Sequence, residues 1–256
     1  VAGYLLRNMP EGGSWAVAGR NRTKLDALVA RLAAEQPEVP APGIVVADTD
    51  DPATLAELAR SARVVITTVG PYLEHGEPLV AACAEAGTDY VDLTGEPEFV
   101  DRMYLGYHDV ARASGARLVH ACGFASIPHD LGVYYTMKQV PEGLPGVVYG
   151  AVHADAQFSG GTFHSAIGQF ARLREAAKAA KARRRKEGRV PGRRIKSVQG
   201  RPHRDAVLNR WLVPLPTIDP QIVLRSAAAL DGYGPDFTYT HYASVGSPVT
   251  AVAGMV

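Results

Sequence analysis

The sequence is poor in cysteine, in excess charge of either sign and in long apolar runs. Its 256 residues include two cysteines, Cys83 and Cys122, too few for a disulfide scaffold and too far apart for a cysteine metal site. The 27 basic and 26 acidic residues leave a net charge of +1, which favours no polyanionic partner. No apolar stretch reaches the ~20 residues of a membrane-spanning helix. We therefore expect a cytoplasmic protein with reduced cysteines, no metal site and no nucleic-acid partner.

Residues 1–135 alternate short apolar runs with segments of helical spacing. Strands are expected at 15–18, 43–47, 63–67, 88–93 and 117–121, and helices at 22–34, 52–60, 77–85, 97–114 and from about 128. This alternation is typical of a parallel sheet covered by helices, and continuous apolar runs such as VVIT are typical of its buried strands. The predicted fold class is α/β, a Rossmann-type doubly wound parallel sheet, with residues 1–135 as its NAD(P)-binding domain.

Residues 136–256 have a different pattern and predict a second, α+β domain for substrate binding or dimerisation. A strand is expected at about 146–158, a long helix over 159–186, a loop over 189–204, a helix at 221–230 and a strand at 236–246. The strand segments alternate apolar and polar residues, as in a sheet with one exposed face.

Glycine is scarce where this fold would need it most. No G-x-G-x-x-G motif opens a helix near Val1, although such a loop follows the first strand of a dinucleotide-binding sheet and cradles the pyrophosphate. Residues 1–9 have the pattern of the helix that follows that loop, and the last residues, TAVAGMV, end in mid-pattern. We therefore expect the chain to be part of a longer protein, with the first strand and the glycine loop upstream.

The segment after the first visible strand predicts which dinucleotide binds. An acidic residue here would favour the free ribose of NAD, but the segment carries Gly19, Arg20, Arg22 and Lys24 instead. Guanidinium groups hold phosphate oxygens bidentately, so the pattern indicates NADP. The alternative is a solvated cationic helix start, which the helix dipole disfavours.

Two further strand ends are expected to contact the cofactor. Asp48 either accepts a hydrogen bond from the adenine amino group or caps the following helix. The next strand ends at Thr67 and Thr68 and breaks at Gly70 and Pro71. Glycine lets a flat ring approach the backbone and proline stiffens the turn, so we expect this turn to border the ribose and nicotinamide.

The last two strand ends in this domain each carry a glycine. Gly95 lies within the polar stretch 92–96, and Gly123 follows the strand ending at residue 121. Ligands of open parallel sheets bind at the carboxyl ends of the strands, so both glycines complete the set of expected cofactor-binding residues.

Several segments together resemble the saccharopine dehydrogenase-like oxidoreductases, most of all the branch with the mycobacterial trans-acting enoyl reductases of phthiocerol and phenolic glycolipid synthesis. They are AVAGRNRTKL, TTVGPYLEHGEPLVAACAEAGTDYVDLTGEPEFV, LVHACGFASIPHDLG, FSGGT and IDPQIVLRSAAAL. The resemblance covers nearly the whole chain and implies a GATGFxG-type loop before residue 1 and a further carboxyl-terminal region. It also implies NADPH binding at Gly19, Arg20, Thr68, Gly70 and Pro71.

The resemblance implies an NADPH-dependent oxidoreductase that reduces an enoyl or keto acyl group in lipid metabolism. The family pattern CGFDSIPSDLG is altered here, because Ala125 replaces the aspartate and His129 replaces the second serine. Two alternatives stay open. Ala125 favours a non-catalytic dinucleotide-binding or lipid-associated scaffold. A saccharopine-type amino-acid dehydrogenase would need basic residues grouped in a cleft, and none group outside the basic run.

Reduction of an activated double bond requires a proton donor near the nicotinamide. The candidate catalytic residues are Tyr72, just past the Gly70–Pro71 break, His129 and His164. Each has a structural alternative, which is packing for the tyrosine and a satisfied structural role for a histidine.

The segment 178–196, named here the basic run, contains ten Lys or Arg residues and one acid, Glu187. It could face an acidic acyl carrier protein, a phospholipid surface, or only water as an ordinary helix end. The expected partners are therefore a small-molecule or carrier-bound acyl substrate and an acyl-carrier or peripheral membrane surface, together with a second copy in a homodimer.

Overall fold

The computed structural model describes residues 1–256 except residues 11, 125, 154–171 and 247–256. The chain divides into two compact units, each treated by itself below. The first unit comprises Val1–Val65, His75–Tyr90 and Asp109–Leu118, and the second comprises Ile66–Glu74, Val91–His108 and Val119–Val256. The division into domains between residues 135 and 136 stays a prediction from the sequence.

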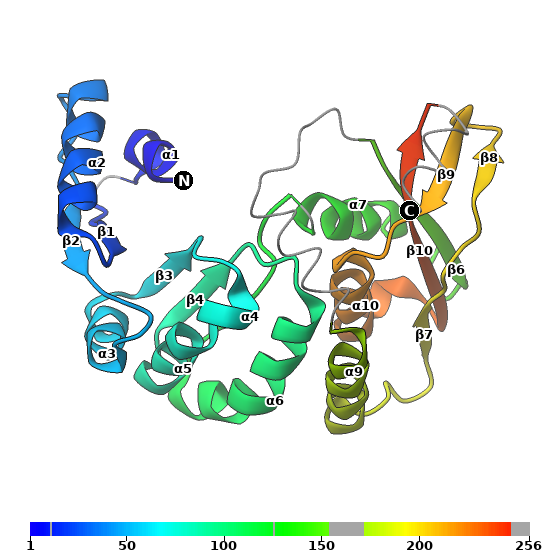
Figure 1. Cartoon of the computed structure of the whole chain (residues 1–256). Coiled ribbons are helices and arrows are strands. Elements are labelled where there is room, and N and C mark those ends of the chain that lie inside the picture. Colours follow the sequence, from blue (N-terminus) through cyan, green and yellow to red (C-terminus); the bar gives the residue numbers. More distant parts are fainter. Residues whose placement is uncertain (11, 125, 154–171, 247–256) are drawn as a thin grey trace. The chain divides into compact units, whose positions relative to one another are not determined.

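Strands and helices alternate along the amino-terminal half of the chain (Figure 1), as the sequence predicts. They are α1 (Ala2–Asn8), β1 (Ala16–Gly19), α2 (Arg22–Glu35), β2 (Gly43–Val46), α3 (Pro52–Ser61), β3 (Val64–Thr67), α4 (Tyr72–His75), α5 (Glu77–Ala86), β4 (Asp89–Asp92), α6 (Pro97–Ser114) and β5 (Leu118–Val119). Strands β1 and β2 pair in parallel, and β3, β4 and β5 form a three-stranded sheet in that order. Within the described residues no ladder joins these two sheets. The predicted α/β, Rossmann-like fold is confirmed.

Local chemistry explains where these helices begin and end. The side chain of Asn21 caps α2 by accepting a hydrogen bond from the backbone N–H of Lys24. Asp51 caps α3 in the same way, and Pro52 occupies the first turn, where its missing N–H costs nothing. Helix α5 ends at Gly87, whose φ of +74° is the left-handed conformation that favours glycine.

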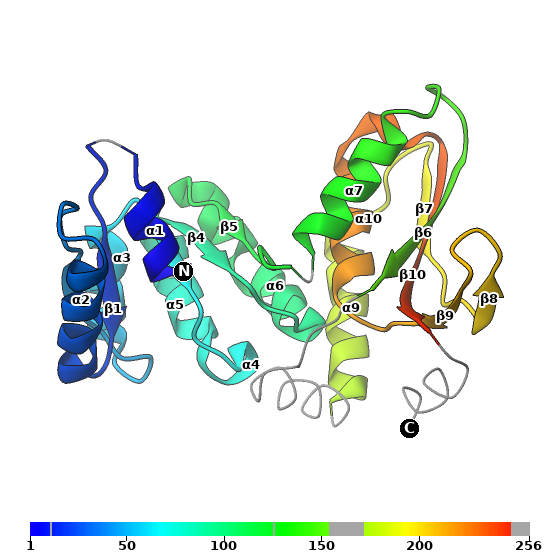
Figure 2. The same cartoon turned by 90° about the horizontal axis from the view of Figure 1, so that it is seen from above.

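The carboxyl-terminal half contains a third sheet, which is mixed and has helices on one face. Its elements are α7 (Ile127–Met137), β6 (Gly146–Val152), α9 (Leu173–Glu187), β7 (Arg194–Ser197), β8 (His203–Asp205), β9 (Arg210–Pro214), α10 (Asp219–Ala229), the 3-10 helix η1 (Asp231–Tyr233) and β10 (Asp236–Val245). Strand β10 is central, because it pairs in parallel with β6 and β7 and antiparallel with β9. Helices α7 and α10 pack against this sheet (Figure 2).

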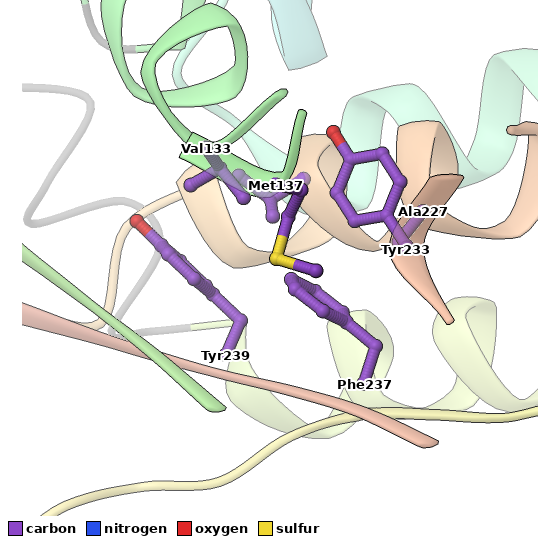
Figure 3. Packing of buried hydrophobic residues seen from close by; sticks show 7 residues of the cluster. Val133, Met137, Ala227, Tyr233, Phe237 and Tyr239 are labelled. Atoms are coloured by element: carbon purple, nitrogen blue, oxygen red, sulfur yellow. The ribbon is translucent and has the colours of Figure 1, made fainter. Parts of the chain in front are cut away.

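A hydrophobic cluster lies where α7 and α10 meet β10 (Figure 3). Its buried members are Val133, Met137, Val223, Ala227, Tyr233, Phe237 and Tyr239. The rings of Tyr233 and Phe237 meet edge to face, with centroids 5.0 Å apart. This core fixes α7 and α10 on β10, and so it fixes the polar residues that these three elements carry.

The structure corrects the expected loop over residues 189–204. Strands β7 and β8 lie partly in this segment, although its sequence has no hydrophobic periodicity. They are short strands that pair through their backbones with β10 and β9, and Ile195 of β7 also packs against the hydrophobic cluster. The first part of the expected long helix lies outside the described residues, and its end is α9. None of the helices that the structure describes is long and apolar enough to cross a bilayer.

We expect the substitution Gly87→Ala to destabilise the protein. A Cβ atom at Gly87 would lie 2.9 Å from the backbone oxygen of Ser114, in addition to the strain of a positive φ. The free energy of unfolding should fall by roughly 1–3 kcal/mol in urea titrations. The matched control is Gly106→Ala on helix α6, where a Cβ meets no atom within 4 Å. It should leave stability unchanged or raise it by up to about 1 kcal/mol, and equal stability of both variants would contradict this description of the α5 terminus.

Candidate functional site

The first unit carries the basic residues expected to select NADP. Arg20, which directly follows β1, is exposed and makes no ion pair or hydrogen bond with any described residue. Arg22 differs, because its Nε donates to Asp26 Oδ1 at 3.0 Å one helical turn further on. The charge of Arg22 is therefore already matched within α2, whereas the charge of Arg20 is not. Gly19 ends β1 beside them, half-buried.

Asp48 follows β2 and is engaged in a turn. Its Oδ1 accepts from the backbone N–H of Asp50 at 3.2 Å, and its own N–H donates to the hydroxyl of Thr54 at 3.1 Å. The helix cap of α3 is Asp51, as described above, so capping is not the role of Asp48. Contact of Asp48 with adenine stays a prediction.

In the second unit, Tyr72 is buried and hydrogen-bonded just past the Gly70–Pro71 break. Its hydroxyl donates to the carbonyl oxygen of Thr67 at 3.2 Å and accepts from the N–H of Leu93 at 3.4 Å. The ring is 5% exposed and packs on Phe99, with centroids 5.6 Å apart. Burial raises the pKa of the Tyr72 phenol to about 12. The side chain thus links the ends of β3 and β4.

The carboxylate of Glu96 fixes the start of α4. Its two oxygens accept from the backbone N–H groups of Tyr72 at 3.1 Å and Leu73 at 2.9 Å. Two of the N–H groups that the first turn of a helix leaves unpaired are satisfied in this way. The conformation of the turn after β3 therefore depends on a residue 24 positions further along the chain.

The sequence did not predict the pairing of Asp92 and His120. Asp92, 1% exposed, accepts from the backbone N–H groups of Thr94 at 3.0 Å and Ala121 at 2.8 Å. Its Oδ2 lies 2.6 Å from Nδ1 of His120. The bonds to His120 and Ala121 join the end of β4 to the residues after β5. Ala121 has a φ of +59°, a strained conformation that costs a residue with a Cβ about 1–3 kcal/mol.

The remaining predicted cofactor-binding residues of the second unit lie at these same strand ends. Thr67 is buried and its hydroxyl accepts from the N–H of Val69 at 3.2 Å, while Thr68 and Gly70 are exposed. A Cβ at Gly95 would meet open space, whereas a Cβ at Gly123 would lie 3.2 Å from the Cβ of Leu93. Gly123 is therefore needed for the close approach of its backbone to the end of β4. Pro71 follows a cis peptide bond.

His129 lies on α7 beside two residues that the sequence did not single out. Its Nε2 is 3.4 Å from Oδ1 of Asp219, and its ring contacts those of Phe124 and His241 at 5.8 and 5.0 Å between centroids. Burial lowers the pKa of His241, which favours its neutral imidazole. The third candidate catalytic residue, His164, lies outside the described residues, as does Ala125.

The basic run is partly neutralised within the second unit. Arg183 of α9 is 6% exposed, and its Nη1 donates to Oδ1 of Asp101 at 2.8 Å. Its Nε forms an ion pair with Oε2 of Glu187 at 3.3 Å. Glu187 in turn accepts from Arg225 at 2.5 Å. The exposed cations of α9, such as Arg184 and Arg185, are the ones left to face a partner or solvent.

Known proteins are similar to this chain in sequence. Residues 1–119 match the family model described as the saccharopine dehydrogenase NADP binding domain. A trans-acting enoyl reductase of Mycobacterium ulcerans is 50% identical over 56% of this chain and 33% of its own length. A Mycobacterium tuberculosis protein provisionally named a trans-acting enoyl reductase is 38% identical over 99% of this chain and 65% of its own length.

A third relative, from Arabidopsis thaliana, is provisionally named a mitochondrial saccharopine dehydrogenase-like oxidoreductase. It is 36% identical over 85% of this chain and 49% of its own length. The chain thus spans between a third and two thirds of the length of these relatives. The cofactor predicted from Arg20 and its neighbours is confirmed as NADP by the domain match. Residues 1–119 belong to the family of saccharopine dehydrogenase NADP-binding domains.

Proposed function

We propose that the protein is an NADPH-dependent reductase of an enoyl or keto acyl group in lipid metabolism, acting in the cytoplasm. The observation that carries this proposal is the 50% identity with a trans-acting enoyl reductase, together with the NADP-binding domain. The cofactor supplies the hydride, so the protein has to orient it and deliver a proton. The acyl substrate is a small thioester or is bound to the carrier of a separate synthase.

Arg20 is the proposed ligand of the 2′-phosphate of NADPH. Its guanidinium is exposed and has no partner among the described residues, so binding phosphate breaks no internal ion pair. The planar donors of arginine match two phosphate oxygens at once. Arg22 would first have to leave Asp26.

The proposed proton donor is His120 rather than Tyr72. The Tyr72 hydroxyl already donates to Thr67, and its high pKa makes it a weak acid. The Nδ1 of His120 is held by Asp92, an arrangement that orients an imidazole for proton transfer. The strained backbone of the adjacent Ala121 is a feature that clusters at functional sites.

Consumption of NADPH by the purified protein tests the proposed reaction. Crotonyl- and acetoacetyl-thioesters, offered on coenzyme A and on acyl carrier protein, should be reduced, and saccharopine should not be oxidised with NADP. Tight NADPH binding without turnover on any thioester would favour the scaffold alternative. Oxidation of saccharopine would refute the proposed role in lipid metabolism and indicate an amino-acid dehydrogenase.

Replacing Arg20 with alanine should weaken NADPH binding while leaving NADH binding unchanged. Loss of charge-assisted hydrogen bonds worth about 1.5–3 kcal/mol corresponds to roughly ten- to a hundredfold in the dissociation constant. Titrating NADPH and NADH by nucleotide fluorescence measures both effects. Arg22→Ala is the matched control and should have the smaller effect, because Arg22 is paired with Asp26. Equal losses for both cofactors in the Arg20 variant would exclude a 2′-phosphate contact.

Tyr72→Phe and His120→Gln should separate packing from proton transfer. Removing the Tyr72 hydroxyl should lower the free energy of unfolding by about 1 kcal/mol, since two backbone groups lose a partner, with little change in kcat. His120→Gln should lower kcat by roughly 100-fold or more. Tyr135→Phe, at an exposed tyrosine, controls for the loss of a hydroxyl. A large fall in kcat for Tyr72→Phe would reinstate Tyr72 as the donor.

A further inference from the structure

Two histidines and one aspartate converge in the second unit from three separate elements. His129 belongs to the first turn of α7, Asp219 begins α10, and His241 lies in the middle of β10. One nitrogen of each ring and one carboxylate oxygen all lie within 4.8 Å of one another. The hydrophobic core that packs α7 and α10 against β10 holds these side chains together.

The separations within this cluster are longer than those of good hydrogen bonds and suit ligands of a common ion. Nε2 of His129 is 3.4 Å from one oxygen of Asp219, and Nε2 of His241 is 3.5 Å from the other. A good N–H···O bond would place these atoms at about 2.7–3.2 Å. Ligands bonded to Zn²⁺ at about 2.0–2.2 Å in tetrahedral geometry lie roughly 3.4 Å from each other.

One of the two oxygens of the Asp219 carboxylate is buried without a hydrogen bond to the described residues. Asp219 is 2% exposed, and its Oδ1 has no hydrogen bond to any described residue. A buried charged oxygen without a partner is costly, so such an atom calls for a partner outside the chain. A cation between Asp219 and the two imidazoles would supply it.

Outer-shell contacts already orient two of the three ligands. The hydroxyl of Tyr239 lies 2.8 Å from Nδ1 of His241, which leaves Nε2 pointing into the cluster. Figure 3 shows this hydroxyl on the end of Tyr239 that points away from Phe237. The hydroxyl of Thr217 donates to Oδ2 of Asp219. Metal-binding histidines and carboxylates characteristically have such partners on their far side.

We propose that His129, Asp219 and His241 form a binding site for a divalent transition-metal ion, with Zn²⁺ as the best match. Two imidazole nitrogens and one carboxylate suit Zn²⁺, whereas Mg²⁺ and Ca²⁺ prefer oxygen ligands alone. The proposed site differs from the prediction of no metal site, which was based on the two cysteines alone. His129 stands where the family pattern has serine, so the third ligand is a feature of this chain rather than of the pattern it resembles.

Metal content and metal-dependent stability of the purified protein test this proposal. Protein prepared without a polyhistidine tag should retain one Zn²⁺ per chain by elemental analysis after gel filtration. After chelation, added Zn²⁺ should raise the melting temperature, and Co²⁺ should give the strong visible absorption of a four- or five-coordinate site. Less than a tenth of an equivalent of metal, with no shift on adding Zn²⁺ or Co²⁺, would overturn the proposal.

Variants at and around the cluster identify the ligands. His129→Ala and Asp219→Asn should each lose more than about a hundredfold in Zn²⁺ affinity, since outer-shell changes alone cost 10- to 100-fold. Tyr239→Phe keeps all three ligands and should lose within that smaller range, so it is informative even where a ligand variant folds poorly. His203→Ala, at an exposed histidine of β8, should change nothing. Equal affinity in the wild type, His129→Ala and Tyr239→Phe would assign the metal to another place and refute the site.

Discussion

The proposed catalytic region depends on the hydrogen bonds that the buried carboxylate of Asp92 makes. This carboxylate binds the segment that follows its own strand through Thr94, and it binds the residues after β5 through Ala121 and His120. These bonds hold Ala121 in a left-handed conformation that an alanine does not adopt alone. Replacing this single side chain would remove the bonds to Thr94, His120 and Ala121 at once. Glu96 acts similarly on the turn after β3, so two buried acids at or after the end of β4 hold the neighbouring segments.

The sequence predicted most of the first half of the fold, because its signals are local. Alternating apolar runs and capping residues such as Asp51 specify each strand and helix from within about ten residues. Helix α6 has the predicted bounds of 97–114. The strands β7 and β8 escaped prediction for the opposite reason. Pairing with β10 and β9 places them in the sheet, and no pattern within residues 189–204 indicates that pairing.

Polar partners were harder to predict than secondary structure, because they are distant in sequence. Asp92 and His120 lie 28 positions apart, and His129 and His241 more than a hundred. Nothing in the spacing of single residues indicates such pairs, whereas the order of strands brings them together. Tyr72 illustrates the same limit. Its position after Gly70 and Pro71 suggested a proton donor, but its hydroxyl is hydrogen-bonded to the backbone groups of Thr67 and Leu93.

The ion pairs of Arg183 also affect the electrostatic potential around the basic run. The charge of Arg183 is compensated by Asp101 and Glu187, so Arg183 adds little to the potential in the surrounding solvent. The exposed cations that remain, such as Arg184 and Arg185, act through water and salt, which screen them over about 8 Å at physiological ionic strength. Arg183 therefore holds α9 in place through Asp101, and the charge that reaches the solvent is that of the exposed cations.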